Sequence, residues 1–204
     1  MNPIRIVGLT GQTGAGKSTV SRTLASHGIE VIDCDLVSRD VVAQERRLLA
    51  DLALEFGITI LNEDGTLNRR RLGSIVFSDK EKLERLNAII FPYIRAEIAY
   101  RVTQRQKRGC RLVVLDAPTL FESGIDADCD AIVSVIAPEN LRLNRIMVRD
   151  HISDTEARNR IASQHDENFF VEHSACVIRN DKDEDTLRFA AVRLAESLRE
   201  AADA

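Results

Sequence analysis

The chain has 204 residues, of which 44% are hydrophobic and 29% charged, the balance of a folded globular protein rather than a disordered one. Its formal net charge of -4 at pH 7 disfavours a generic nucleic-acid binder, which would be basic. No apolar run approaches the roughly 18 residues that a membrane helix needs, and residues 1–10 lack a secretory signal core. We therefore expect no nucleic-acid partner, no membrane association and a cytoplasmic location.

The cysteine and histidine patterns predict neither disulfides nor a zinc site. The four cysteines, Cys34, Cys110, Cys129 and Cys176, are far apart and form no C-x-x-C pair. We interpret them as reduced thiols that behave mostly as small buried hydrophobic side chains. The four histidines form no pair at helical i,i+4 spacing, so we predict no zinc site.

Short aliphatic strands alternate with helices along much of the chain. In chain order, the sequence predicts a strand at 4–9, a helix at 17–27, and strands at 30–32, 112–115 and 131–136. A helical hairpin at 139–165, a strand at 177–178 and a closing helix at 183–200 follow. Continuous aliphatic strands are buried on both faces, which indicates a parallel sheet flanked by helices, an α/β fold.

The stretch from residue 37 to residue 109 interrupts this alternation. Its periodicity is mainly helical, with predicted helices at 38–56, 69–76 and 80–107. A polar turn containing Asp64-Gly65 separates the first two helices. We interpret the stretch as a helical insertion beside the sheet.

The segment from Gly11 to Ser18, reading G-Q-T-G-A-G-K-S, fits the phosphate-binding P-loop pattern G-x-x-x-x-G-K-[ST]. It follows an aliphatic strand and opens a helix, as the pattern requires. Glycines let the N–H groups turn inward as an anion nest, and the helix adds its positive N-terminal end. Lys17 can reach the β- and γ-phosphates, the Ser18 hydroxyl can bind Mg²⁺, and Thr19 lies beside the nucleotide.

Two acidic residues follow the second predicted strand, Asp33 and Asp35. Ligands of parallel α/β sheets bind at the carboxyl ends of strands, where the phosphate loop also lies. Asp35 is our candidate to orient an acceptor hydroxyl and accept its proton. The alternative is that one or both residues cap the following helix.

Asp116 and an arginine row are further candidates. Asp116 ends an aliphatic strand, so it either holds Mg²⁺ or is only a polar strand end. Arg142, Arg145 and Arg149 stand at i, i+3 and i+7 on one helix face. That face either clamps phosphates through planar guanidinium groups or is simply solvated.

The chain resembles the dephospho-coenzyme A kinase family from about Ile4 to Asn180. The blocks that carry the resemblance are ordered as in the family: G-L-T-G at 8–11 with the loop, G-I-E-V-I-D-C-D at 28–35, D-A-P-T-L-F-E at 116–122, and V-I-R-N at 177–180. Shorter matches lie at 56–57, 64–69, 76–77, 145–149 and 160–164. Phe91 departs from the pattern, because the family usually has His before Pro92.

The resemblance implies that MgATP phosphorylates the ribose 3′-hydroxyl of dephospho-coenzyme A, giving coenzyme A and ADP in the last step of coenzyme A biosynthesis. It implies a core at 1–36, 110–138 and 175–204, an acceptor-binding insertion at 37–109 and a lid at 139–168. It makes Asp35 the base, Lys17 and Arg145 phosphate clamps, and Thr10 a residue near the acceptor. The ATP-binding residues would then be Gly11, Gly14, Ala15, Gly16, Lys17, Ser18, Thr19 and Asn180, and the acceptor-binding residues Thr10, Asp33, Asp35 and Phe91.

Two other functions compete with this interpretation. Another P-loop kinase, acting on a nucleoside or nucleotide, would share the chemistry and differ in the acceptor pocket. A GTP switch would carry D-x-x-G and N-K-x-D segments, which do not occur in suitable places. We expect ATP, Mg²⁺ and a small-molecule acceptor as ligands, in a monomer or weak homo-oligomer.

Overall fold

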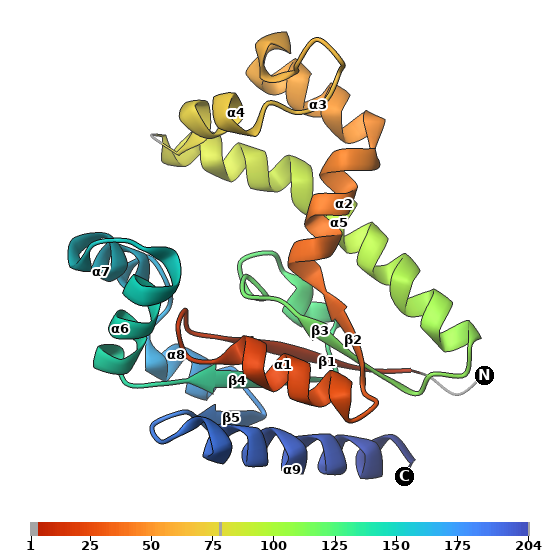
Figure 1. The fold of residues 1–204 in the computed structure, drawn as a ribbon. Coiled ribbons are helices and arrows are strands. Elements are labelled where there is room, and N and C mark those ends of the chain that lie inside the picture. Colours follow the sequence, from red (N-terminus) through yellow and green to blue (C-terminus); the bar gives the residue numbers. More distant parts are fainter. Residues whose placement is uncertain (1–3, 78, 204) are drawn as a thin grey trace. The chain divides into compact units, whose positions relative to one another are not determined.

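The computed structural model describes residues 4–77 and 79–203, and the chain divides into two compact units (Figure 1). The first unit comprises Met1–Asp33 with Gln104–Ala204, and the second comprises Cys34–Thr103. The predicted boundaries of the core, the acceptor-binding insertion and the lid stay predictions, because the compactness of a unit does not show which function its segments have.

The first unit is built on a five-stranded parallel sheet in the order β2-β3-β1-β4-β5. Its strands are β1 (Arg5–Gly11), β2 (Glu30–Asp33), β3 (Leu112–Asp116), β4 (Ala131–Ile136) and β5 (Cys176–Arg179). The α/β fold predicted from the aliphatic strands is confirmed. The carboxyl ends of β1, β2 and β3 meet at one edge, because Leu9 and Asp33 both stand opposite Asp116 in the register.

Helices α1 (Lys17–Ser26) and α9 (Glu184–Asp203) pack against each other and share one core with the sheet (Figure 1). Alternate residues of β1, Val7 and Leu9, point into this core, where they meet Val20 and Leu24 of α1. On the opposite face, Leu120 lies against Gly8. The phosphate-binding segment therefore joins a buried strand to a buried helix.

The remaining elements of the first unit follow β3 and β4. A 3₁₀ turn, η2 (Ile125–Asp128), precedes β4, and α6 (Glu139–Asp150), α7 (Asp154–Ala162) and α8 (Glu167–Glu172) lie between β4 and β5. Helices α6 and α7 form the predicted hairpin, held by a cluster of Leu143, Ile146 and Ala157. Ser153 begins α7 with a capping box, in which its side chain and that of Glu156 exchange hydrogen bonds with the main chain.

The second unit is helical, as the sequence predicts. It contains α2 (Cys34–Gln44), α3 (Arg46–Phe56), η1 (Ile58–Ile60), α4 (Arg69–Val76) and the greater part of α5 (Lys80–Lys107). The single helix predicted at 38–56 is wrong, because two helices meet at Glu45. Its carboxylate accepts a hydrogen bond from the Arg47 N–H at 3.0 Å and begins α3 as an N-cap.

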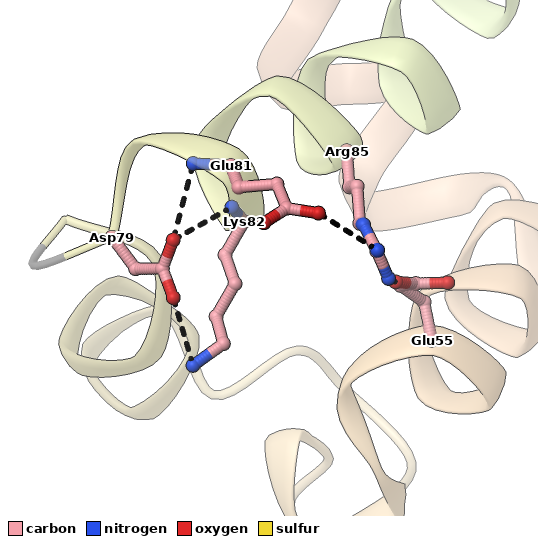
Figure 2. A network of polar contacts seen from close by, with 5 residues as sticks. All are labelled: Glu55, Asp79, Glu81, Lys82 and Arg85. Atoms are coloured by element: carbon pink, nitrogen blue, oxygen red, sulfur yellow. Dashed lines mark hydrogen bonds and ion pairs between the residues drawn. The ribbon is translucent and has the colours of Figure 1, made fainter.

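Figure 2 shows the polar network that fixes the start of α5 in the second unit. The Asp79 carboxylate accepts from the main-chain N–H groups of Glu81 and Lys82, which lowers the pKa of Asp79. Arg85 then bridges Glu81 on its own helix and Glu55 on α3, with both N–O distances at 3.0 Å. These groups are mostly exposed, so the network orients α5 more than it stabilises the unit.

The cysteine side chains are less buried than the sequence predicts. Among the described residues no disulfide links the four cysteines, yet only Cys34 is buried and Cys176 is exposed. The expectation of mostly buried thiols is therefore wrong, since strand-end and turn positions carry the others. Cys129 is a partial exception, because desolvation raises the pKa of its thiol to about 12.

In the part of the chain that the structure describes, no helix has both the length and the hydropathy of a bilayer crossing.

We expect Val20→Ala to lower the free energy of unfolding by roughly 1–3 kcal/mol, because it leaves a cavity in the core. Val20 is fully buried, whereas Val148, also helical, is 75% exposed. The matched Val148→Ala change should stay within about 0.5 kcal/mol of the parent. Urea unfolding followed by circular dichroism measures both values, and equal losses would contradict the assigned core.

Candidate active site

The loop between β1 and α1 turns its main chain through left-handed conformations. Gly14 has φ 77°, a conformation that side chains disfavour. A Cβ at Gly14 would also lie 2.9 Å from the Arg142 carbonyl oxygen and 3.0 Å from Ile146 of α6. Glycine is thus required here by both the backbone and the close approach of the hairpin.

Several N–H groups of this loop are available to a ligand. Within the described residues, the main-chain N–H groups of Gly14, Gly16, Lys17 and Ser18 have no hydrogen-bond partner. The last two belong to the first turn of α1, whose N-terminal end carries positive partial charge. Together these amides can form the anion nest that the motif predicts.

Lys17 and Asp116 form an ion pair beside the loop. The Lys17 Nζ contacts the Asp116 Oδ1, and the two side chains are only 18% and 11% exposed. Asp116 ends β3 and Lys17 begins α1, so the fold itself brings both predicted residues together. A carboxylate is also the kind of hard oxygen ligand that Mg²⁺ prefers, and the predicted role of Asp116 in holding that ion stays a prediction.

The two acidic candidates after β2 lie in different units. Asp33 is the last residue of β2, exposed and opposite Asp116 in the register. Asp35 is the second residue of α2 and belongs to the second unit, as does Phe91 on α5. The roles predicted for these residues stay predictions. Thr10 is fully buried, and its Oγ1 has no described partner.

The arginines predicted to share one face have three different surroundings. Arg142 is buried and donates from Nε to the Ala137 carbonyl oxygen at 3.0 Å, and its burial lowers its pKa. Arg145 reaches the loop, where its Nη1 donates to the Gly14 carbonyl oxygen at 3.3 Å. Arg149 is paired with Asp150 on the exposed side of α6. Arg145 is therefore the member of the row whose side chain donates a hydrogen bond to the phosphate loop.

Two glutamines to which the sequence assigned no role also hold the loop. Gln164, after α7, accepts a hydrogen bond from the Thr13 N–H through Oε1 at 2.7 Å. Gln12 is buried and accepts from the Ala137 N–H at 3.3 Å. The motif leaves positions 12 and 13 open, and Gln164 lies 151 residues from its partner. In the sequence, only the short match to the family at 160–164 pointed to Gln164.

Asn180, predicted to bind ATP, lies behind the loop. The residue is 5% exposed, and its Nδ2 donates to the Ala15 carbonyl oxygen at 2.8 Å. Ser18 is exposed and Thr19 is half-buried at the start of α1. No cluster of three or more His, Cys, Asp or Glu side chains suited to a metal occurs within residues 4–77 and 79–203.

Comparison with known proteins identifies the family. A profile of the family described as dephospho-CoA kinase matches residues 5–185. A Fusobacterium nucleatum protein named dephospho-CoA kinase is 37% identical over 195 residues, covering 96% of this chain and 99% of that one. The chain belongs to the dephospho-CoA kinase family. It is accordingly an ATP-dependent kinase.

Solved structures agree with this family assignment. A crystal structure of a Thermus thermophilus protein has a TM-score of 0.79 and 32% identity, and covers 96% of this chain and 98% of that one. A dephospho-CoA kinase from Campylobacter jejuni has a TM-score of 0.73 and 26% identity, with the same coverage of 96% and 98%. The dephospho-CoA kinase family thus accounts for both units of the chain.

We expect Gln164→Ala to loosen the hairpin from the loop, because it removes the acceptor of the Thr13 N–H. Amide hydrogen exchange at Thr13 should become faster by about tenfold, the scale of one hydrogen bond. The matched change Gln106→Ala lies on α5 outside the loop and should leave Thr13 exchange unaltered. Unchanged exchange in Gln164→Ala would show that the contact does not protect the loop.

Proposed function

We propose that this chain transfers the γ-phosphoryl group of MgATP to the ribose 3′-hydroxyl of dephospho-coenzyme A. The family profile and the relatives that carry this name support the acceptor. The observation that carries the phosphoryl chemistry is the nest formed by the unpartnered amides of Gly14, Gly16, Lys17 and Ser18, with the Lys17 side chain beside it. Such a loop binds a polyphosphate tail through fixed dipoles and one mobile cation.

In this proposal the loop amides hold the β- and γ-phosphates, and Lys17 leaves Asp116 to contact the transferred group. Arg145, beside Gly14, adds a second positive charge as charge builds on the leaving oxygen. The Ser18 hydroxyl and the Asp116 carboxylate are oxygen donors of the kind that Mg²⁺ prefers, so these residues would hold the ion. Bound there, Mg²⁺ would neutralise phosphate charge.

We assign Asp35 as the general base. The acceptor 3′-hydroxyl gives its proton to the carboxylate while its oxygen forms a bond to the γ-phosphorus. The bond from that phosphorus to the β–γ bridging oxygen breaks, and ADP leaves with the electron pair. Asp33, two residues earlier, is the alternative base. Phe91 and Thr10 keep their predicted places near the acceptor as part of the proposal.

We assign the acceptor to the second unit. Within this unit, a cavity of about 430 Å³ lies between α2, the start of α3 and α5. Arg101 spans its wall, donating to Asp40 and Glu97 at 2.8 Å each, so one guanidinium partly offsets these two carboxylates. Tyr93, also in the lining, donates to Asp51 at 2.6 Å. A wall rich in hydrogen-bonding groups suits an acceptor arm of amide and hydroxyl groups.

A coupled assay of ADP release tests the proposal directly. Dephospho-coenzyme A with ATP should give rapid ADP release that depends on Mg²⁺. A nucleoside monophosphate that turns over well, while dephospho-coenzyme A does not, would make the chain a nucleotide kinase instead. The cytoplasmic location, the absence of a nucleic-acid partner and the monomeric or weakly oligomeric state stay predictions.

Lys17→Ala should lower kcat/KM by at least about 10²-fold, because charge stabilisation dominates a loose phosphoryl-transfer transition state. Lys107→Ala, at the exposed end of α5, makes the same change outside the site and should leave kcat/KM within twofold. Steady-state ADP release measures both. Near-parent turnover in Lys17→Ala would remove the lysine from the mechanism.

Asp35→Asn should lower kcat by about 10²-fold, the usual scale for loss of a general base, with less effect on the KM for ATP. Asp203→Asn, at the exposed end of α9 beside Arg111, should leave kcat unchanged. An unaltered kcat in Asp35→Asn, with a large loss in Asp33→Asn, would transfer the role of base to Asp33.

A further inference from the structure

The phosphate loop is held from behind by one buried side chain, that of Asn180. Asn180 follows β5, and its main-chain N–H donates to the Ile136 carbonyl oxygen at 2.8 Å, which fixes it to the end of β4. The whole residue is only 5% exposed. The Nδ2 donates to the Ala15 carbonyl oxygen at 2.8 Å, and this bond is itself buried.

Asn180 also explains why position 16 is glycine. Gly16 has φ 103°, and a Cβ there would lie 2.6 Å from the Asn180 Nδ2 and 2.9 Å from Leu187 of α9. Real Cβ atoms do not approach other heavy atoms that closely. The amide of Asn180 therefore packs directly against the loop backbone at the point where α1 begins.

The Asn180 bond sets the direction of the next N–H group. The carbonyl of Ala15 and the N–H of Gly16 belong to one planar trans peptide, so they point in opposite directions. Asn180 holds the carbonyl on the sheet side, which turns the Gly16 N–H away from the core. That N–H has no partner among the described residues.

The amide of Asn180 keeps this orientation although it leaves a polar atom unsatisfied. Its Oδ1 is buried and has no hydrogen-bond partner within the described part of the chain. An unsatisfied buried acceptor is unfavourable, so an asparagine at this position costs stability. The hydrogen bond that its Nδ2 donates to the Ala15 carbonyl oxygen compensates for this cost.

We propose that Asn180 is a positioning residue that aims the Gly16 N–H at the phosphates of ATP, and that it makes no contact with the adenine. The assignment rests on ATP binding at the loop, as in the proposed function, but it is independent of the acceptor. It also replaces the predicted role of Asn180 as a nucleotide contact.

The test separates the phosphate tail from the base. Calorimetric titrations measure the dissociation constants of inorganic tripolyphosphate and of adenosine for the parent and for Asn180→Leu, which has nearly the same size but no donor. We expect the constant for tripolyphosphate to rise about tenfold or more, the scale of one hydrogen bond to a charged group. The constant for adenosine should stay within twofold.

A control and a second readout keep the test decisive. Ile178→Val, on β5, also perturbs the buried core and should leave both constants unchanged. In the parent, the amide proton of Gly16 should shift strongly when tripolyphosphate is added. In Asn180→Leu this shift should shrink relative to that of Gly14, whose peptide Asn180 does not hold.

Three results would overturn the proposal. Weaker binding of adenosine in Asn180→Leu would make the residue a base contact. Equal losses in Asn180→Leu and Ile178→Val would make its role merely structural. If Asn180→Leu does not fold, the parent protein alone can overturn the proposal. It does so if tripolyphosphate leaves the chemical shift of the Gly16 amide proton unchanged. Failure of dephospho-coenzyme A to react affects none of these readouts, so the two proposals can fail separately.

Discussion

The direction of the peptide groups between Gly11 and Ser18 is the constraint on which the site depends. A loop whose amides face a ligand must bury their carbonyls or bond them elsewhere, since each trans peptide points its two polar groups in opposite directions. Here two side chains from later parts of the chain meet this need, because Arg145 and Asn180 donate to the carbonyls of Gly14 and Ala15. A third, Gln164, instead accepts from the N–H of Thr13 and fixes that peptide. Phosphate recognition is thus a property of the folded unit rather than of the motif alone.

The ion pair of Lys17 with Asp116 has a related effect. A lysine on a flexible stem would lose side-chain entropy on ordering, and the carboxylate keeps its ammonium beside the loop. Both charges are largely withdrawn from water, so each would be unfavourable without the other. The carboxylate therefore limits the positions that the ammonium can take.

The sequence predicted what local patterns determine. Aliphatic runs located all five strands to within a few residues, and the strand-loop-helix context of the motif placed Lys17 at the start of α1. The break at Glu45 was missed, because an N-cap inside a continuous helical periodicity gives little signal. The spacing of Arg142, Arg145 and Arg149 fixed a shared helix face but not what packs on it. The contacts of Gln164 and Asn180 span 151 and 165 residues, a separation that no spacing rule reaches.

Gly14 joins two requirements at a single position. Its N–H belongs to the set of unpartnered amides, and its bare Cα is where α6 rests on the loop. A side chain at this position would displace α6 and, at the same time, change the direction of the loop amides. A substitution at this residue therefore cannot alter one of these properties without disturbing the other.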